Sequence, residues 1–218
     1  MSLADVVLAF DTSDGYCAAA LMRDGDIAAA RYEEMTKGQA ERLMPMLYEV
    51  LREADVAWAD IDRIGVGTGP GNFTGIRLSV AAARGLALSL GRPAIGVTRF
   101  DALAFEQPIP CAVALDARRG RIFLQVFGGD GAPDIAPRLL DLNLLPDEIF
   151  GHDLACVGSA GEALAERIGG KVAPAAVSPA PAIAHIAASR EPGKRPVPFY
   201  LRDADAAPPR DAAPAILP

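Results

Sequence analysis

Two aspartates in this chain of 218 residues each follow a short apolar strand and could face a phosphate or a metal ion. Val6 to Phe10 leads into Asp11-Thr12-Ser13, and Ala112 to Leu115 leads into Asp116. A carboxylate can ligate a hard metal ion, but Asp and Ser side chains in a turn also bond their own backbone. Asp11 and Ser13 are therefore either candidate cofactor contacts or caps of the turn between two strands.

A glycine-rich turn from Gly67 to Gly75 offers a second place for an anion. A short apolar strand, Arg63 to Gly67, precedes it, and a helix over about Thr74 to Leu90 follows, ending at Gly91. Helix N-termini attract phosphate or carboxylate groups, so Gly71 and Asn72 are candidate contacts, and Asn72 or Thr74 could cap the helix. The turn has no Walker lysine and no sixth-position glycine of the dinucleotide fingerprint, so a purely structural turn is the alternative.

Two helices with large apolar surfaces could meet a partner. From Ile76 to Leu90 only Arg77 and Arg84 are charged, so the sheet can cover one side and something else must cover the other. An earlier helix, ending near Ala54, begins near Met44 or bends at Pro45. The residues predicted at the partner interface are Leu43, Met46, Leu47, Val50, Ser79, Ala82, Ala83 and Leu86. The alternative is a central core helix covered by its own chain.

Other residue types that do chemistry are sparse. His152 and His185 are the only histidines, and neither has a carboxylate at ligand spacing, so the sequence predicts no metal site and no catalytic residue. A Ser-His-Asp arrangement stays open, although no Gly-x-Ser-x-Gly turn is present. Cys17, Cys111 and Cys156 are odd in number and widely spaced, which predicts buried thiols in a reducing compartment.

Composition narrows the function classes. The chain is 51% hydrophobic but only 6% aromatic, so its core must be built from Ala, Val, Leu and Ile. A net charge of −7 makes it a poor stand-alone binder of nucleic acid, because an acidic chain gains little from counterion release. We read no apolar run of about 18 residues and no export signal, and therefore expect a cytoplasmic protein outside the membrane.

The elements that must position these residues repeat along the chain. Val6–Phe10, Tyr16–Met22 and Ile27–Glu34 are typical of three antiparallel strands, followed by helix, strand and helix. The strand that ends in Asp116 repeats the opening, and Cys156 to Glu162 weakly mirrors the glycine turn. This pattern predicts an α/β fold made of a duplicated unit, with an eroded second half.

The best domain boundary is the linker from Gln107 to Pro110. Just before it, Thr98 to Asp101 resembles a capping box. We expect an N-terminal subdomain at 1–106 and a smaller C-terminal subdomain at 107–203, in which Pro174, Pro179 and Pro181 interrupt structure before one short helix near Ala182 to Ser189. Residues 204–218, rich in alanine and proline, are typical of a disordered tail.

Several stretches resemble the TsaB (YeaZ) family of bacterial proteins. Gly69-Pro70-Gly71-Asn72-Phe73-Thr74-Gly75-Ile76-Arg77 and Ala83-Arg84-Gly85-Leu86-Ala87 are similar to its signature GPGSFTGLR…AKGLA. Gly96 to Ala104 continues the likeness, and Pro198 to Arg202 resembles the family's terminal Tyr-Leu-Arg. The resemblance is strong over about the first 105 residues and loose beyond. It implies the actin-like ATPase (ribonuclease-H-like) fold, in which an aspartate placed like Asp11 faces phosphate or metal.

The resemblance also implies a function. It points to a non-catalytic dimerisation or activating subunit of the machinery that adds threonylcarbamoyl to the adenosine beside the anticodon of tRNAs. Implied partners are the catalytic homologue TsaD and the ATPase TsaE, with tRNA bound only through the complex and a homodimer when the protein is alone. No cofactor is expected on the chain by itself, although ATP or ADP could sit at a subunit interface.

One departure from the family's pattern bears on whether this chain does chemistry of its own. Many relatives have a histidine shortly before the segment Glu41-x-Leu43-x-Pro45, where this chain has Gln39, which argues against metal or acid–base chemistry. The alternative function is a stand-alone ATP-dependent enzyme or hydrolase of the actin-like class, with Asp11 and Asp116 as metal-facing carboxylates.

Overall fold

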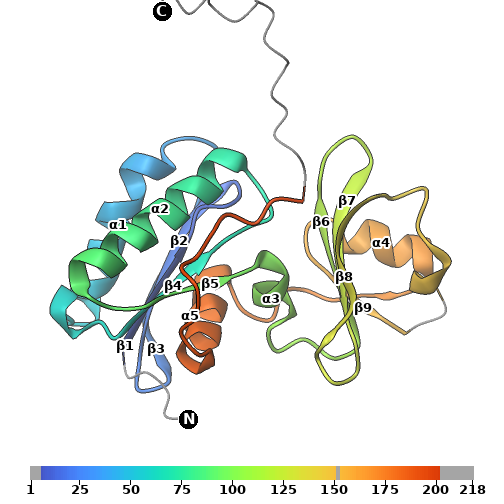
Figure 1. Ribbon diagram of the computed structural model, residues 1–218. Helices are drawn as coiled ribbons and strands as arrows, with labels where there is room; N and C mark the ends of the chain where they lie inside the picture. Colours follow the sequence, from blue (N-terminus) through green and yellow to red (C-terminus); the bar gives the residue numbers. More distant parts are fainter. Residues whose placement is uncertain (1–5, 151–152, 202–218) are drawn as a thin grey trace, which may run out of the picture.

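Two five-stranded mixed sheets form two lobes with the same strand order (Figure 1). The structure is a computed structural model that describes residues 6–150 and 153–201, so the predicted tail at 204–218 lies outside it. The first sheet has the order β3-β2-β1-β4-β5 and the second β8-β7-β6-β9-β10. The strands of the first are β1 (Val6–Asp11), β2 (Tyr16–Arg23), β3 (Asp26–Glu34), β4 (Arg63–Gly67) and β5 (Ala94–Val97).

Helices cover both faces of the first sheet. Alternation along β1 turns Leu8 and Phe10 toward α1 (Gln39–Glu53) and α2 (Phe73–Leu90), and Val7 and Ala9 toward α5 (Pro179–Ser189). The short helix η1 (Trp58–Asp60) precedes β4. The expected start of α1 near Met44 is wrong: the helix begins at Gln39 and continues through Pro45, which is exposed.

The second lobe repeats this plan with smaller parts. Its strands are β6 (Cys111–Asp116), β7 (Arg121–Phe127), β8 (Pro133–Asp141), β9 (Ala155–Val157) and β10 (Lys171–Val172). One face of this sheet packs on α4 (Gly161–Ile168) and the other on α3 (Arg99–Ala104). Between β8 and β9 the described part of the chain has only the short helix η2 (Asp147–Ile149), where the first half has α1 between β3 and β4. The second half is thus eroded in its helices and last strands. Strand β8 was not predicted; at the sheet edge it accommodates Pro137.

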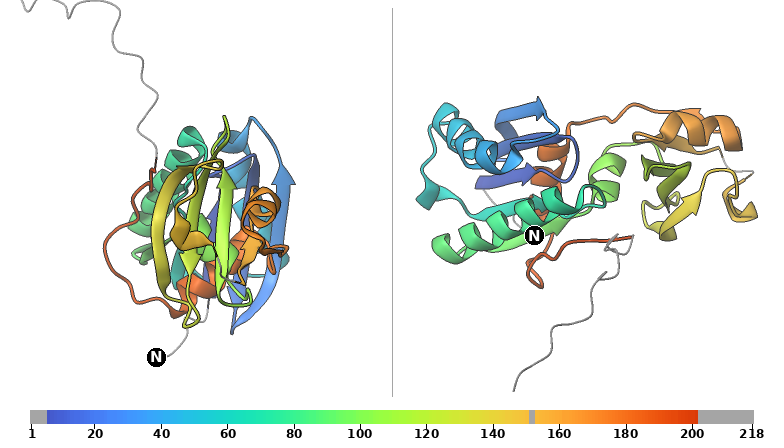
Figure 2. Two further views of the ribbon diagram at one scale, coloured as in Figure 1. Left: turned by 90° about the vertical axis from the view of Figure 1, so that its right-hand side faces the viewer. Right: turned by 90° about the horizontal axis from the view of Figure 1, so that it is seen from above.

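The last helix of each half covers the sheet of the other half. Helix α3 follows the first sheet, yet its Phe100 packs with Cys111 and Val113 of β6. Helix α5 follows the second sheet, yet it lies against β4, where a Cβ on Gly65 would be 2.9 Å from Ile183 Cγ2. Segment 107–203 therefore contributes to both lobes, and the chain crosses between them twice (Figure 2).

Several local predictions are confirmed. Thr98 Oγ1 accepts from Asp101 N–H at 3.0 Å and Asp101 Oδ2 from Thr98 N–H at 3.3 Å, the expected capping box. Gly91 ends α2 in the left-handed region at φ 65°. Pro179, by contrast, does not interrupt structure, because it sits at the first position of α5, where no N–H partner is needed.

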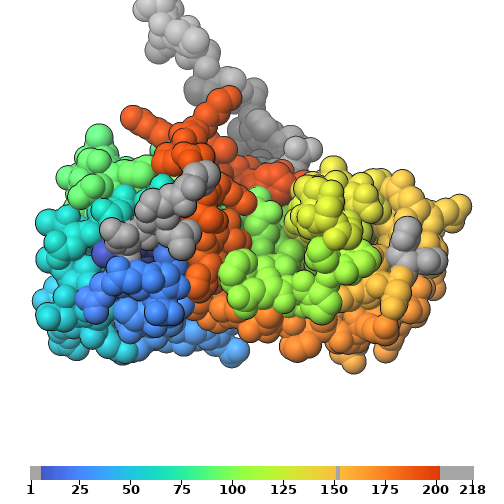
Figure 3. All heavy atoms as spheres, turned by 90° about the horizontal axis from the view of Figure 1, so that it is seen from below, coloured from blue at the N-terminus to red at the C-terminus, as the bar shows by residue number. Residues whose placement is uncertain are grey.

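The chain after α5 returns between the lobes. Seen from below, α5 lies in orange between the first lobe and α3, and the chain after it continues in red toward the upper edge of the view (Figure 3). Phe199 N–H donates to Thr68 O at 2.8 Å, and the Phe199 ring meets Phe100 edge-on at 6.5 Å between centroids. The duplicated mixed sheets with exchanged helices confirm the predicted actin-like ATPase fold.

Candidate functional site

The carboxylate of Asp11 is enclosed by hydrogen bonds from residues of its own turn and of β2. Asp11 lies at the end of β1 with no exposed surface. Its Oδ1 accepts from Ser13 N–H at 2.8 Å, and its Oδ2 accepts from Ser13 Oγ at 2.9 Å and Tyr16 Oη at 2.6 Å. Burial and this carboxylate raise the pKa of the Tyr16 hydroxyl well above its ordinary value. The geometry therefore favours Asp11 and Ser13 as caps of the turn over contacts to a ligand.

The glycine-rich turn packs directly on this first turn. Thr12 N–H donates to Ser79 Oγ at 2.8 Å, and Thr12 Oγ1 donates to Gly75 O at 2.8 Å. A Cβ on Gly75 would be 1.9 Å from Thr12 O, and one on Gly71 2.0 Å from Ser13 O. These glycines are needed because two backbones touch, which supports the structural alternative for the turn.

Asn72 is the cap of α2. Its side chain accepts from Thr74 N–H at 3.0 Å and Gly75 N–H at 3.3 Å, and its own N–H donates to Ser13 O at 2.7 Å. These helix N–H groups, which could have held an anion, are bonded within the chain. The structure thus brings the candidate cofactor residues Asp11, Ser13, Gly71 and Asn72 together, and their contacts are with one another and with the turn.

A largely buried arginine beside this turn, Arg99, was not predicted as a site residue. Arg99 pairs with Asp14 Oδ2 at 2.7 Å and donates to Pro70 O at 3.2 Å. Burial lowers the pKa of the Arg99 guanidinium, but nearby Tyr16, Asp14 and Asp11 outweigh it and hold that pKa above its ordinary value. The only sequence signal was its place inside the capping box.

A groove of about 460 Å³ opens beside Arg99. The rings of Tyr16 and Tyr32, 5.3 Å apart, form part of its wall. The remaining lining comes from Asp14, Ala102, Leu103 and residues 175–179. Among its polar groups, the Asp14–Arg99 pair and the Tyr16 hydroxyl already bond within the chain.

The second turn repeats the aspartate-to-backbone hydrogen bond of the first turn, but in an exposed position. Asp116 Oδ1 accepts from Arg118 N–H at 2.8 Å, and Asp116 N–H donates to Ser159 Oγ at 2.9 Å. Asp116 is exposed, unlike Asp11. Within residues 6–150 and 153–201, no cluster of three or more His, Cys, Asp or Glu side chains could hold a metal ion.

Most of the residues predicted at a partner interface point into the core instead. Leu43, Met46, Leu47 and Val50 are buried between α1 and the sheet. Ser79 bonds to Thr12 and Ala83 packs in the same core, while Ala82 and Leu86 are half-buried. The residue set is corrected because the densest apolar stripe of each helix covers its own sheet. The prediction that the two helices meet a partner stays a prediction.

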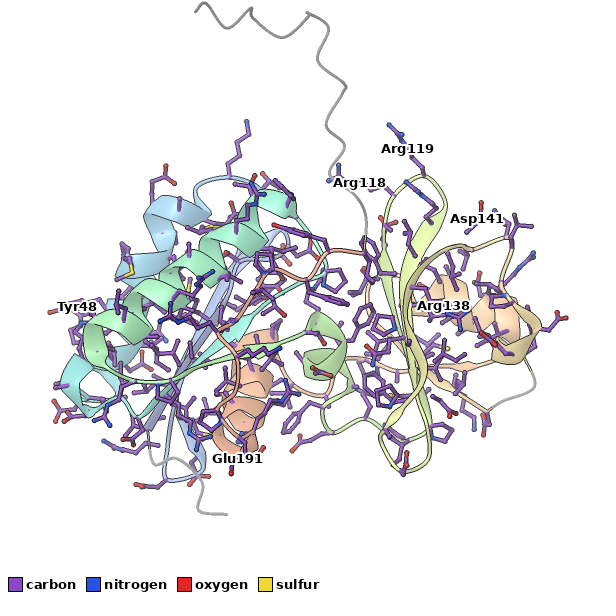
Figure 4. All side chains as sticks on the ribbon, viewed as in Figure 1. Tyr48, Arg118, Arg119, Arg138, Asp141 and Glu191 are labelled. Atoms are coloured by element: carbon purple, nitrogen blue, oxygen red, sulfur yellow. The ribbon has the colours of Figure 1, made fainter. Side chains whose placement is uncertain are left out.

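The outer face of α1 and α2 exposes other apolar residues. On α1, Met44 is 45% exposed and Tyr48 59%, and Tyr48 points away from the sheet (Figure 4). On α2, Leu88 is 81% exposed and Phe73 40%, and the small residues Ala81 and Gly85 are exposed between them. We call these six residues the outer helix face.

Helix α2 is apolar enough to meet a membrane criterion. By length and composition its 18 residues could cross a membrane, although Arg77 and Arg84 interrupt the apolar residues. The criterion is weak, since core helices of other proteins satisfy it. Here one side of α2 packs on the sheet of its own lobe.

The chain's last described residues join the start of α2. Tyr200 stacks on Phe73 at 5.1 Å between centroids, its Oη accepts from Arg77 Nε at 3.0 Å, and the Arg77 guanidinium lies 3.9 Å above the Phe73 ring. Tyr200 thereby places a half-exposed aromatic side chain at one end of the outer helix face.

The three cysteines and His185 make packing contacts within the fold. Cys17, Cys111 and Cys156 are buried and free, as predicted, and burial raises the pKa of each thiol to about 11. The His185 ring stacks on Phe105 at 5.5 Å. His152 lies outside the described residues.

Comparison with known proteins extends the likeness beyond the first half. The family described as TsaD, tRNA N6-adenosine threonylcarbamoyltransferase, matches residues 33–136. An uncharacterized protein of Mycobacterium tuberculosis is 33% identical over 204 residues, 93% of this chain and 94% of that protein. The Escherichia coli tRNA threonylcarbamoyladenosine biosynthesis protein TsaB is 33% identical over 129 residues, 57% of this chain and 55% of its own length.

A solved structure carries the same family name over the whole chain. It is a Pseudomonas aeruginosa protein described as uncharacterized and similar to the peptidase YeaZ. It is 30% identical with a TM-score of 0.74, and the match covers 93% of this chain and 100% of that one. Both lobes are therefore related to proteins of one family. The chain belongs to the TsaB (YeaZ) family.

Proposed function

We propose that this chain is a non-catalytic subunit of the complex that adds threonylcarbamoyl to the adenosine beside the anticodon of tRNAs. It binds the catalytic homologue TsaD, and the ATPase TsaE joins the pair. The name of the Escherichia coli relative, a tRNA threonylcarbamoyladenosine biosynthesis protein, supports the pathway. The match of residues 33–136 to the TsaD family, which spans parts of both lobes, supports a partner that is homologous to this chain.

The observation that carries the proposal is the outer helix face. This face exposes apolar and small side chains of α1 and α2 to water, with Leu88 81% and Tyr48 59% exposed, which is unfavourable for an isolated chain. A homologous partner offers the same pair of helices, and two pairs can pack as a four-helix contact in which Ala81 and Gly85 allow close approach. The same surface can pair with itself, so the free chain forms a homodimer that the partner replaces.

The closed first turn supports a role without chemistry on this chain. The Asp11 oxygens accept three hydrogen bonds from Ser13 and Tyr16, which leaves them no open side toward a metal ion or phosphate. Any ATP or ADP is then held at the junction with a partner subunit. The net charge of −7 fits a chain that meets tRNA only inside the complex.

Reconstitution tests the role. Purified TsaD, TsaE, a threonylcarbamoyl donor and tRNA are mixed with and without this chain, and modified adenosine is counted over repeated turnovers. We expect sustained modification only when the chain is present, because its binding shifts TsaD toward an active conformation. Equal modification without the chain would refute the proposal.

Single charges on the outer helix face test the surface. Leu88→Glu and Tyr48→Glu should each weaken association with TsaD by at least about 10-fold, because each replaces an apolar contact with a carboxylate that must lose its water on association. The matched control is Leu144→Glu, which replaces a 76% exposed leucine on the second lobe. Sedimentation velocity measures association, and circular dichroism checks the fold. Unchanged association of both variants would place the interface elsewhere.

A further inference from the structure

The turn between β6 and β7 holds a backbone conformation that its residues disfavour. Arg118 has φ 64°, Arg119 φ 55° and Gly120 φ 71°, so three consecutive residues are left-handed. For residues other than glycine this region brings Cβ close to the next carbonyl oxygen. Glycine, asparagine or aspartate usually fill such positions. Two adjacent arginines here call for a reason outside the turn.

The hydrogen bonds of the turn do not supply that reason. Arg118 N–H donates to Asp116 Oδ1 at 2.8 Å, Arg121 N–H donates to Arg118 O at 3.2 Å, and Ala117 N–H donates to Arg121 O at 2.9 Å. The donors and acceptors at positions 118 and 119 are backbone atoms. Glycine or asparagine would make the same bonds with less strain, so the fold does not require arginine side chains.

The two guanidinium groups are presented to solvent. Arg118 and Arg119 are exposed and project from the tip of the hairpin (Figure 4). Among the described residues, no carboxylate lies within ion-pair distance of either, whereas Arg42, Arg99 and Arg138 all have one. The carboxylate of Asp116 caps the turn backbone at Arg118 N–H. A chain of net charge −7 thus holds two neighbouring cations without an internal partner at this tip.

We propose that Arg118 and Arg119 bind neighbouring backbone phosphates of an RNA, a contact that forms when the complex has brought the RNA near. The inference rests on the proposed function, which supplies an RNA substrate. Guanidinium groups bind phosphate oxygens through paired N–H donors, and adjacent residues can reach adjacent phosphates of one strand. The left-handed turn fixes the backbone from which both side chains extend. The contact reads no bases, so it serves every tRNA that the complex modifies.

The same complex tests the contact through its salt dependence. Binding of tRNA to the assembled complex is measured by fluorescence anisotropy over a series of salt concentrations, with wild type and Arg118→Ala/Arg119→Ala. Losing two phosphate contacts should weaken binding by roughly 10-fold near 0.1 M salt and lower the slope of log affinity against log salt by about 1.5 to 2. Arg118→Lys/Arg119→Lys should retain most of the slope.

The matched control removes two cations from the same lobe. Arg138→Ala/Lys171→Ala changes the net charge equally, but those side chains already pair with Glu148 and Asp153. Its affinity for tRNA should fall less than 2-fold. If the double alanine variant keeps the slope and affinity of wild type in a complex that still modifies tRNA, the proposal is wrong and the proposed function stands. If instead association of the subunits weakens at unchanged tRNA affinity, the arginines meet an acidic protein surface, which also overturns it.

Discussion

The two hairpin turns at equivalent places of the duplicated fold share one aspartate-to-backbone hydrogen bond but differ in how far they are exposed to solvent. Asp11 and Asp116 each accept from the N–H two residues on, both at 2.8 Å. Each turn also has a backbone N–H bonded to a serine hydroxyl, Ser79 at 2.8 Å in the first and Ser159 at 2.9 Å in the second. Yet the first turn is buried and the second is exposed.

The difference comes from the helix that follows the neighbouring strand. In the first half, α2 and its glycine turn lie directly on Thr12 and Ser13. In the second half, the shorter α4 starts at Gly161, and Asp116 stays in solvent. In the second half the turn before α4 also bonds its neighbouring strand, since Ala160 N–H donates to Ala114 O at 3.0 Å, but it does not cover the residues after Asp116. The same hydrogen-bonded turn is therefore covered in one lobe and presents side chains to solvent in the other. The sequence of the turn alone does not determine whether it is covered or exposed, because that depends on which elements pack on it.

The largest expected effect comes from breaking the contact of the first turn with α2. Gly75→Ala places a Cβ 1.9 Å from Thr12 O, and a backbone carbonyl cannot move aside as a side chain could. We expect a loss of more than about 3 kcal/mol in the free energy of unfolding. Urea titration followed by circular dichroism measures it.

The control for this substitution lies in the same helix. Gly85 has no atom within 4 Å of an added Cβ, so Gly85→Ala should stabilise the protein by about 0.5–1 kcal/mol through helix propensity. If the two substitutions have equal effects, the close approach of the two backbones is not what α2 contributes to the first turn.

A smaller effect separates the two aspartates. In Asp11→Asn the amide NH₂ cannot accept from Ser13 Oγ or Tyr16 Oη as the carboxylate does, which should cost about 1–3 kcal/mol. Asp116→Asn keeps an oxygen for Arg118 N–H at an exposed position, so its effect should stay within about 0.5 kcal/mol. Thermal unfolding of the pair measures the difference. Similar losses in both would mean that the two turns are equally important to the fold.

The smallest expected effect has the opposite sign. Arg119→Gly removes the Cβ that the left-handed conformation disfavours and should raise the free energy of unfolding by about 1 kcal/mol. Arg138→Gly, in strand β8, is the matched control and should destabilise instead. Chemical denaturation at low protein concentration gives both values. A destabilised Arg119→Gly variant would show that the arginine side chain supports the turn.

Local signals in the sequence were enough for much of the fold. The strand Arg63–Gly67, the Thr98 capping box and the Gly91 helix end were predicted as the structure has them, because each depends on residues close in the chain. The repeat of a strand ending in aspartate correctly indicated a duplicated unit. Pro179 was misread because its effect depends on whether a helix begins at it or contains it.

The parts that failed depend on contacts between distant residues. Helix α2 is apolar nearly all round, so composition could not say that Ser79 and Ala83 face the sheet while Leu88 faces outward. Arg99 became part of the first turn only because Asp14 and Pro70 are brought beside it by three separate elements. Such assignments require the packed structure.

The exchange of the last helices has a consequence for synthesis. Val7 and Ala9 of the first strand are covered by α5, which ends at Ser189. A chain emerging from the ribosome therefore completes the core of its first sheet only after Ser189 has been made. Contacts this distant in sequence slow folding, because a long loop must close before they form. We therefore expect the two lobes to fold together as one cooperative unit, because the first sheet is covered only when α5 packs on it.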